Sequence, residues 1–281
     1  MEKIPARFFE DVLGQLTIFW MLPTNTEFFG SFGSCARKLI KNGHRKTVVI
    51  ENGEFTDFFF NDYGGTLVQS DDSNFPTKFK IRNDIEYVVS STEVPVITVK
   101  LRKQLERLSM EPALLRLDLY GLIDKKWVEL FSSLQKLNAI SVDYFDPNVI
   151  CLLERLLSQK QILQLVVYSN YGEKEINLFR AFFQQEQFQC LDFKFWNNDM
   201  HDWIMACKGN NDLRGKSVVW RCREVLHDAS FEDCGFTDRG VYQFINADVK
   251  VCYCVYEDTN HNDFAKFMEK VDCSFVEFTR G

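Results

Sequence analysis

The feature that most constrains this chain is a short apolar segment that recurs with a helix-like run after it. Four segments alternate apolar and polar residues with period two, the pattern of a strand with one buried face. They are Leu115–Leu119, Ile140–Tyr144, Leu163–Val167 and Leu191–Phe195. Between them lie helix-like runs at Trp127–Leu134, Asn148–Leu157 and Ile176–Phe183. The strand pattern returns at intervals of roughly 23 to 28 residues.

This interval predicts the fold class. A single strand–helix unit cannot bury its apolar side alone, so neighbouring units stack and their strands pair in parallel. The interval is similar to that of leucine-rich repeats (LRRs). We therefore predict an α/β fold, an LRR-like solenoid of βα repeats over residues 46–281, preceded by a short helical module at residues 1–45. The last apolar segment, Ser274–Thr279, is expected to form an edge strand.

Residues 46–110 leave two alternatives open. Asn52-Gly53 separates the β-rich runs Lys46–Glu51 and Phe55–Phe60, and Asn-Gly in such a place is a strong signal for a β-hairpin. The segment is therefore either a small irregular hairpin region or the first repeats of the solenoid. The sequence pattern does not decide between them.

Aligning the four strand segments predicts a substrate-binding face. The core side is expected to hold Leu115, Leu117, Ile140, Val142, Leu163, Leu165, Leu191 and Phe193. Three outward rows follow: Arg116, Ser141, Gln164 and Asp192; then Asp118, Asp143, Val166 and Lys194; then Tyr120, Phe145, Tyr168 and Trp196. Aromatics in register on an exposed face would form a binding surface, because such side chains dominate interface energetics. The alternative is that they only cover the places where each strand turns into its loop.

From these rows we select seven candidate substrate-binding residues: Tyr120, Phe145, Tyr168, Trp196, Asp118, Asp143 and Lys194.

Composition and charge indicate which classes of partner this protein can bind and in which cellular compartment we expect it. A net charge of -7 and a pI of about 5.3 argue against a nucleic-acid or anionic-membrane binder. No apolar run approaches the ~20 residues of a membrane helix, and we expect no secretory signal. Five of the nine cysteines lie in apolar segments: Cys151, Cys190, Cys207, Cys222 and Cys273. Free cysteines in such segments predict a reduced protein of the cytoplasm or nucleus.

The sequence contains no strong catalytic or metal-binding motif. Cys252-x-Cys254 places two thiols on one side of a strand, with His227 and Cys234 nearby in sequence, but this spacing is poor for zinc. We therefore expect no enzyme activity, no cofactor and no metal. An enzyme of unknown type stays an alternative, and it would require a deep pocket with converging titratable groups.

The N-terminal residues resemble the opening of an F-box. In an F-box, Leu-Pro is followed by two large apolar residues, an acid, Ile-Leu and a closing Leu. The corresponding residues are Ile4-Pro5, Phe8-Phe9, Asp11, Val12-Leu13 and Leu16. The later F-box phrase is echoed by Ser34–Leu39, which has no tryptophan. Together with Phe32–Cys35 and an LRR-like body, this start resembles the expanded families of nematode F-box-like proteins.

The resemblance implies a non-catalytic substrate adaptor. The N-terminal module would dock on the adaptor protein of a cullin–RING ubiquitin ligase, and the body would hold an unknown protein substrate. The docking residues implied are Ile4, Pro5, Phe8, Phe9, Leu13 and Leu16. Because the second half of the module departs from the F-box pattern, the alternative is an LRR-like interaction or scaffold protein that has lost ligase docking.

Overall fold

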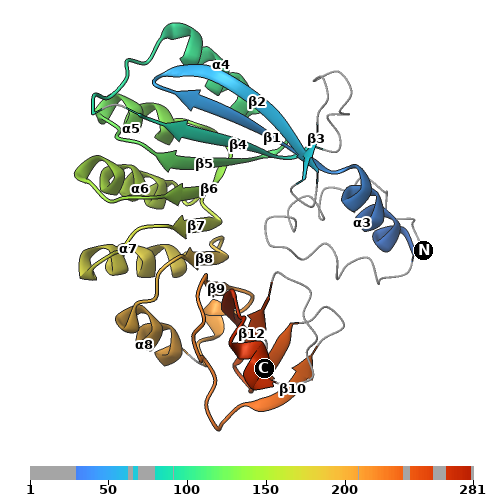
Figure 1. Cartoon of the computed structure of the whole chain (residues 1–281). Coiled ribbons are helices and arrows are strands. Elements are labelled where there is room, and N and C mark those ends of the chain that lie inside the picture. The colour runs from blue at the N-terminus through green and yellow to red at the C-terminus, as the bar shows by residue number, and fades with distance from the viewer. Residues whose placement is uncertain are drawn as a thin grey trace. The chain divides into compact units, whose positions relative to one another are not determined.

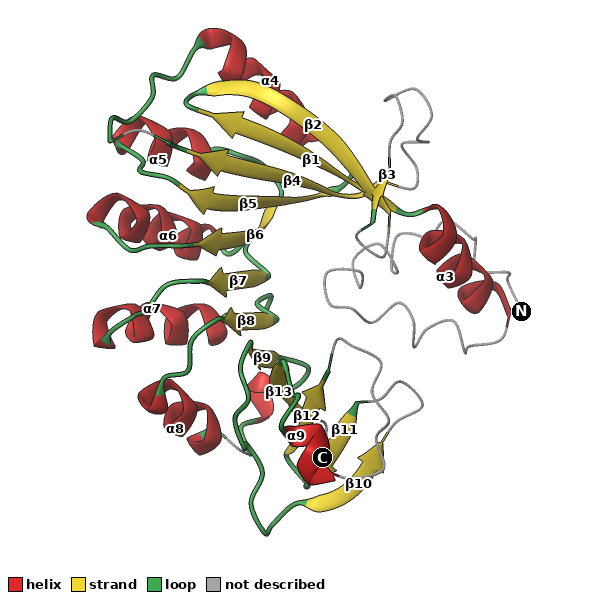
Figure 2. Ribbon diagram, viewed as in Figure 1, coloured by secondary structure: helices red, strands yellow, loops and turns green. Residues whose placement is uncertain are grey.

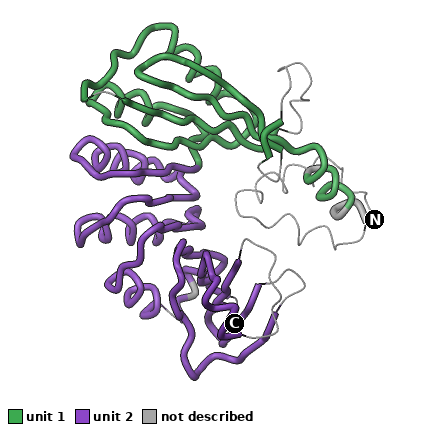
Figure 3. Tube along the Cα trace, in the orientation of Figure 1, with its two compact units in different colours: residues 1–138 green, residues 139–281 purple. Residues whose placement is uncertain are grey.

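The computed structural model describes residues 30–62, 66–68, 80–90, 92–207, 209–236, 241–255 and 264–279. The six predicted ligase-docking residues, Ile4 to Leu16, lie outside these ranges. The chain divides into two compact units, residues 1–138 and 139–281 (Figure 3). This boundary falls inside the predicted 46–281 body, and the division into a 1–45 module and a body stays a prediction.

Unit 1 holds a five-stranded mixed sheet, and helices α4 (Val99–Met110) and α5 (Lys125–Ser132) lie on one of its faces (Figures 1 and 2). Its elements in chain order are α3 (Gly30–Asn42), β1 (His44–Glu51), β2 (Glu54–Asp62), β3 (Leu67–Val68), β4 (Lys80–Val88), α4 (Val99–Met110), β5 (Leu114–Tyr120) and α5 (Lys125–Ser132). The strand order is β3-β2-β1-β4-β5. Strands β1, β4 and β5 are parallel neighbours, whereas β2 is antiparallel to both β1 and β3.

The predicted hairpin at Asn52-Gly53 is confirmed. Asn52 and Gly53 join β1 to β2 with φ angles of 49° and 86°, and a two-residue type I′ turn requires positive φ at both positions. The Asn52 N–H also donates to the Val88 carbonyl at 3.1 Å, which ties the turn to the end of β4. Residues 46–110 thus contain a hairpin together with β4 and α4, and α4 leads to β5, which pairs with β4 in parallel.

An aromatic cluster fixes α5 against the sheet of unit 1. Tyr87 of β4 and Trp127 of α5 have ring centroids 4.6 Å apart, and Phe131 lies 5.1 Å from Trp127. All three side chains are buried, and the polar atoms of Trp127 and Tyr87 both have hydrogen-bond partners. The Trp127 indole N–H donates to the Pro95 carbonyl at 2.8 Å, and the Tyr87 hydroxyl donates to the Leu122 carbonyl at 3.0 Å. Each such ring contributes roughly 1.5–3 kcal/mol through burial.

Unit 2 begins with parallel strands and ends with antiparallel ones. Its elements are β6 (Leu137–Val142, which starts at the unit boundary), α6 (Pro147–Gln159), β7 (Gln164–Val167), α7 (Glu173–Phe183), β8 (Cys190–Phe193), α8 (Asn198–Ala206), the short 3₁₀ helix η4 (Asn211–Leu213), β9 (Ser217–Trp220), β10 (Glu232–Phe236), β11 (Tyr242–Ile245), β12 (Val249–Cys254), α9 (Phe264–Met268) and β13 (Cys273–Phe278). The strand order is β6-β7-β8-β9-β13-β12-β11-β10.

The α/β class is therefore confirmed, with one correction at the C-terminus. Strands β6 to β9 pair with one another in parallel, and helices connect them. The expected edge strand at Ser274–Thr279 is wrong, because β13 lies between β9 and β12 and pairs antiparallel with both. In the sequence β13 follows β10, β11 and β12, yet in the sheet it lies between β12 and β9.

Side-chain caps explain where the helices begin. Asp124, Asp146 and Asn197 each stand directly before a helix, and each side chain accepts backbone N–H groups from the first turn. For α6, the Asp146 carboxylate accepts from Asn148 at 2.8 Å and Val149 at 2.7 Å. Such caps satisfy N–H groups that have no partner within the helix. Within the described ranges, no helix is both long and apolar enough to cross a membrane.

Replacing the Asp146 cap should weaken the fold in a site-specific way. We expect Asp146→Ala to lower the free energy of unfolding by about 1 kcal/mol, because two N–H groups of α6 lose their acceptor. Urea denaturation followed by circular dichroism measures this change. The matched control is Asp143→Ala, since Asp143 is exposed three residues earlier and should change stability by less than about 0.5 kcal/mol. Equal losses for the two variants would contradict the capping role.

Candidate functional site

The candidate site is the face of the parallel sheet in unit 2 that lies away from the helices. Alternate residues of each strand point to opposite faces. Phe193 of β8 packs on Phe179 of α7, with ring centroids 5.6 Å apart, so the buried residues in register with Phe193 face the helices. These are Val142, Val167 and Trp220. The residues between them along each strand face the other way.

A row of polar side chains continues this register just beyond the strands. The backbone N–H groups of Tyr168, Lys194 and Arg221 donate to the carbonyls of Val142, Val167 and Phe193 at 2.8 to 2.9 Å. Asp143, which follows Val142, is in register with these three residues. We call Asp143, Tyr168, Lys194 and Arg221 the polar row. Asp143, Lys194 and Arg221 are exposed, and Tyr168 is half-buried.

Arg221 is held in place by two neighbours. Its guanidinium donates two hydrogen bonds to the Asp192 carboxylate, at 2.9 and 2.7 Å, in the bidentate geometry that arginine favours. It also lies over the Tyr168 ring, 5.6 Å from the centroid. Asp192 is 5% exposed and forms its ion pair with Arg221. The polar row is thereby anchored to β8 and β9.

The register expected for this face was wrong by two residues at β7. Ser141, Val166 and Asp192 form one row, so Val166 does not align with Asp143 and Lys194 as predicted. Tyr168 takes that place instead. Residues two apart face the same side of a sheet, so the slip leaves the predicted core unchanged and only shifts the outward rows. The alternating pattern therefore identified the buried face but not the pairing.

The expected row of four aromatics does not assemble. Phe145 packs on Phe179 at 5.8 Å, and Trp196 packs on Trp220 at 5.2 Å, so both turn toward the helix side of the sheet. Tyr120 is 41% exposed and belongs to unit 1. Phe145 and Trp196 thus fit the alternative in which aromatics cover the strand-to-loop turns. Whether any of the four contacts a substrate stays a prediction.

Asp118 occupies an outward position but is buried in an ion pair. The Arg116 guanidinium donates to its carboxylate at 2.8 Å, and Asp118 is 6% exposed. On the neighbouring strand, Arg82 pairs with Asp84 at 3.1 Å, and Asp84 lies opposite Arg116. Glu86 lies opposite Asp118. The structure therefore places Asp118 within a network of charges across β4 and β5 and not on an accessible contact surface.

This network makes Glu86 an unfavourable charge. Partial burial raises the pKa of its carboxyl group, and the negative charges of Asp118 and Asp84 raise it further. A carboxyl group whose pKa is raised on folding binds its proton more tightly in the folded state. The free energy of unfolding therefore decreases as the pH rises above about 4.5, the pKa of this carboxyl group in the unfolded chain.

We expect Glu86→Gln to be more stable than the wild type at pH 7. The difference should shrink as the pH falls to 4.5 and below, where the wild-type carboxyl group becomes protonated in both states. Urea titrations at a series of pH values measure it. Glu54→Gln is the control, because Glu54 is exposed at the end of β2. A stabilisation of Glu86→Gln that does not vary with pH would exclude charge repulsion as its cause.

The His227–Tyr253 pair brings together two groups capable of proton transfer. His227 Nδ1 and the Tyr253 hydroxyl oxygen are 2.7 Å apart, and the Leu226 N–H donates to the same oxygen at 2.8 Å. The imidazole stacks on Phe244 with ring centroids 3.6 Å apart. Burial lowers the pKa of His227 and raises the pKa of Tyr253 to about 12. Both groups are therefore neutral near pH 7.

The two thiols singled out for zinc are also unsuited to reactivity. Burial raises the pKa of Cys252 to about 12 and that of Cys254 to about 11, so both thiols are protonated near pH 7. Cys254 lies opposite Cys273 on β13, and neither cysteine forms a disulfide bond. Among the described residues, no three His, Cys, Asp or Glu side chains are grouped so that they could hold a metal ion.

Comparison with models of known protein families, with curated proteins and with solved structures finds no match. The function is therefore inferred from the residues and surfaces of this chain itself.

Proposed function

We propose that this chain is a non-catalytic protein-interaction module, an F-box-like substrate adaptor of a cullin–RING ubiquitin ligase. In this proposal the βα units form an LRR-like solenoid, and residues 1–45 form the docking module. The adaptor would act by proximity, since holding a substrate beside the ubiquitin-charged enzyme raises its effective concentration without new chemistry. The location expected for such a protein is the cytoplasm or nucleus.

The proposed binding function rests on the polar row. It presents Asp143, Lys194 and Arg221 with a tyrosine among them, on a sheet face that the described helices of unit 2 do not cover (Figure 2). These charged groups follow directly after the strands, and Asp192 restrains Arg221, so Arg221 loses little side-chain entropy when it binds another protein. A surface of this kind supports binding of a protein substrate.

The position of α3 supports the helical module. The faint second F-box phrase, Ser34–Leu39, lies within α3 (Gly30–Asn42), and Cys35 and Ala36 on this helix are buried. Gly30 and Gly33 would weaken a helix in isolation, so its packing must contribute to its stability. A packed helix at this position is consistent with the arrangement that the F-box resemblance implies.

Ligase docking can be tested by co-purification. We expect the wild-type protein to co-purify with the adaptor protein of a cullin–RING ligase, and Pro5→Asp combined with Leu13→Glu to abolish it. The two substitutions place charges on the apolar face of the predicted N-terminal helix, which must be desolvated in the interface. The control is Arg7→Asp with Gly14→Glu, which adds acidic residues on the opposite side of that helix.

If the wild type never binds the ligase adaptor, the docking part of the proposal is lost. Substrate binding without docking would then indicate the alternative, an LRR-like interaction protein. The two parts of the proposal are therefore tested separately.

Substrate binding can be tested by reversing one charge in the polar row. We expect Lys194→Glu to lose protein partners that the wild type retains in crosslinking pull-downs, because Lys194 is exposed beside Arg221 in this row. The control, Lys174→Glu, makes the same charge change on an exposed position of α7 and should retain the partners. Loss in both variants would point to a general effect of charge and would count against the polar row.

A further inference from the structure

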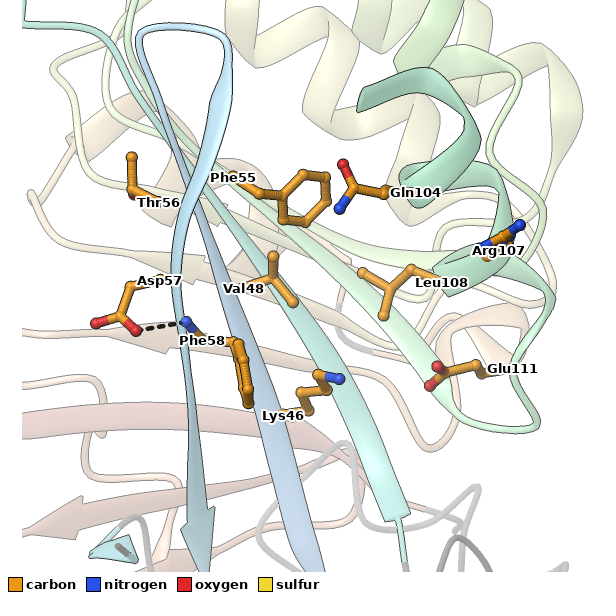
Figure 4. Close-up of a pocket in the computed structure, with 10 residues that line it drawn as sticks. All are labelled: Lys46, Val48, Phe55, Thr56, Asp57, Phe58, Gln104, Arg107, Leu108 and Glu111. Atoms are coloured by element: carbon orange, nitrogen blue, oxygen red, sulfur yellow. Dashed lines mark hydrogen bonds between the residues drawn. The ribbon is translucent and has the colours of Figure 1, made fainter. Parts of the chain in front are cut away.

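A cleft in unit 1 lies between the β1–β2 hairpin and α4, apart from the polar row. Its volume is about 460 Å³, and Val48, Phe55, Phe58 and Leu108 supply its apolar lining (Figure 4). Phe58 is 49% exposed, which is high for a phenylalanine on the helix-facing side of a sheet. An exposed aromatic beside buried aliphatic groups is typical of a surface that binds another chain.

The strand that borders this cleft is open along one edge. β2 pairs with β1 along its length, but on its other side it pairs with β3 only at Phe60 and Asn61. Residues Glu54 to Phe59 have no strand partner on that side within the described part of the chain. The Phe58 N–H donates instead to the Asp57 carboxylate at 2.7 Å, and a charge at this position protects a strand edge from pairing. The cleft is therefore suited to binding through side chains and not through an added strand.

The acidic groups of the cleft already have partners. The Glu111 carboxylate accepts from Lys80 at 2.8 Å and from Asn83 at 2.9 Å. The Asp57 carboxylate accepts the Phe58 N–H. An incoming cation would compete with these interactions, so the two acids do not favour a basic ligand.

The cationic groups lie beside the apolar lining. The Lys46 ammonium is 5.0 Å from the centroid of the Phe58 ring. Arg107 is exposed on α4, and within the described residues it has no ion pair. A guanidinium in this position can bind a carboxylate through two parallel hydrogen bonds. The cleft thus combines an apolar surface with positive charge at its rim.

We propose that this cleft docks a short extended segment of a partner protein in which large apolar residues alternate with acidic ones. The apolar side chain would pack on Phe58, Val48 and Leu108, and the carboxylates would bind Arg107 and Lys46. The exposure of Thr56 and Asp57 along β2 leaves the cleft open at its side, which suits a continuous chain better than an enclosed small molecule. This site is independent of the proposed ligase docking and of the polar row.

Fluorescence anisotropy with three labelled peptides tests the proposal on the full chain. The probes are Glu-Leu-Glu-Phe-Glu and its variants with every Glu replaced by Gln or by Lys. We expect the acidic peptide to bind saturably at concentrations up to about 1 mM, the Gln peptide to bind about fivefold more weakly, and the Lys peptide not to bind. Binding of the acidic peptide should weaken with added salt.

Two variants assign this binding to the cleft. Arg107→Glu should weaken binding of the acidic peptide about tenfold and improve binding of the Lys peptide. Phe58→Ala should weaken the acidic and Gln peptides alike, because it removes an apolar contact and no charge. Both positions are exposed, so neither substitution should unfold the protein. Arg102→Glu is the matched control on α4, since Arg102 is exposed and does not line the cleft.

Three outcomes would overturn the proposal. The first is no saturable binding of the acidic peptide. The second is binding that Arg107→Glu and Arg102→Glu weaken equally, since the cleft would then have no special role. The third is self-association of the wild type that Phe58→Ala abolishes, measured by sedimentation, because a second copy of the chain would then be the occupant.

Discussion

The parallel pairing of β6 to β9 is the constraint on which the candidate site depends. Each strand places alternate residues under the helices, and these residues are almost wholly apolar. Burial on one face fixes the orientation of every strand, because turning a strand by one residue would bring polar side chains into the core. The residues between the buried ones along each strand then lie on the outward face. The residues of the polar row are aligned because each directly follows one of four strand residues that are in register: Val142, Val167, Phe193 and Trp220.

Burial of one face does not by itself determine the rows on the other. A slip of two residues at β7 would keep Leu165 and Val167 in the core, so the alternating pattern cannot distinguish the two pairings. The structure selects its pairing through the backbone, where the Tyr168 N–H donates to the Val142 carbonyl. Hydrogen bonds of this kind carry no sequence signature. For the same reason the central position of β13 could not be predicted, since its partners β9 and β12 are chosen by long-range pairing.

The features that were predictable from the sequence are local ones. The βα alternation, the hairpin at Asn52-Gly53 and the expected helices at α5, α6 and α7 depend on spacing within a few residues. The aromatics were harder to place. Tyr168 comes directly after β7, whereas Phe145 and Trp196 come three residues after the ends of β6 and β8. Phe145 packs on Phe179, and Trp196 packs on Trp220. A large ring at a loop can turn toward any neighbouring apolar surface, and only the packed structure determines which one.

An outward position is also not the same as an accessible one. Asp118 and Asp192 both point away from the helices, yet an arginine holds each of them and both are nearly inaccessible to solvent. Each of these acids forms an ion pair within the protein and thereby holds the neighbouring arginine in place. The exposed groups of the polar row are Asp143, Lys194 and Arg221, and Tyr168 is half-buried among them.

The buried and the exposed polar groups of this chain differ in their chemistry. A nucleophile or base needs a pKa shifted toward neutrality in its reactive form. Burial does the opposite for Cys252, Cys254 and Tyr253, whose pKa values rise, and it keeps His227 neutral. In contrast, Lys194, directly after β8, and Arg107, on α4, are exposed charges. Exposed charges contribute little to folding, but on a fixed framework they can select a partner by its charge pattern.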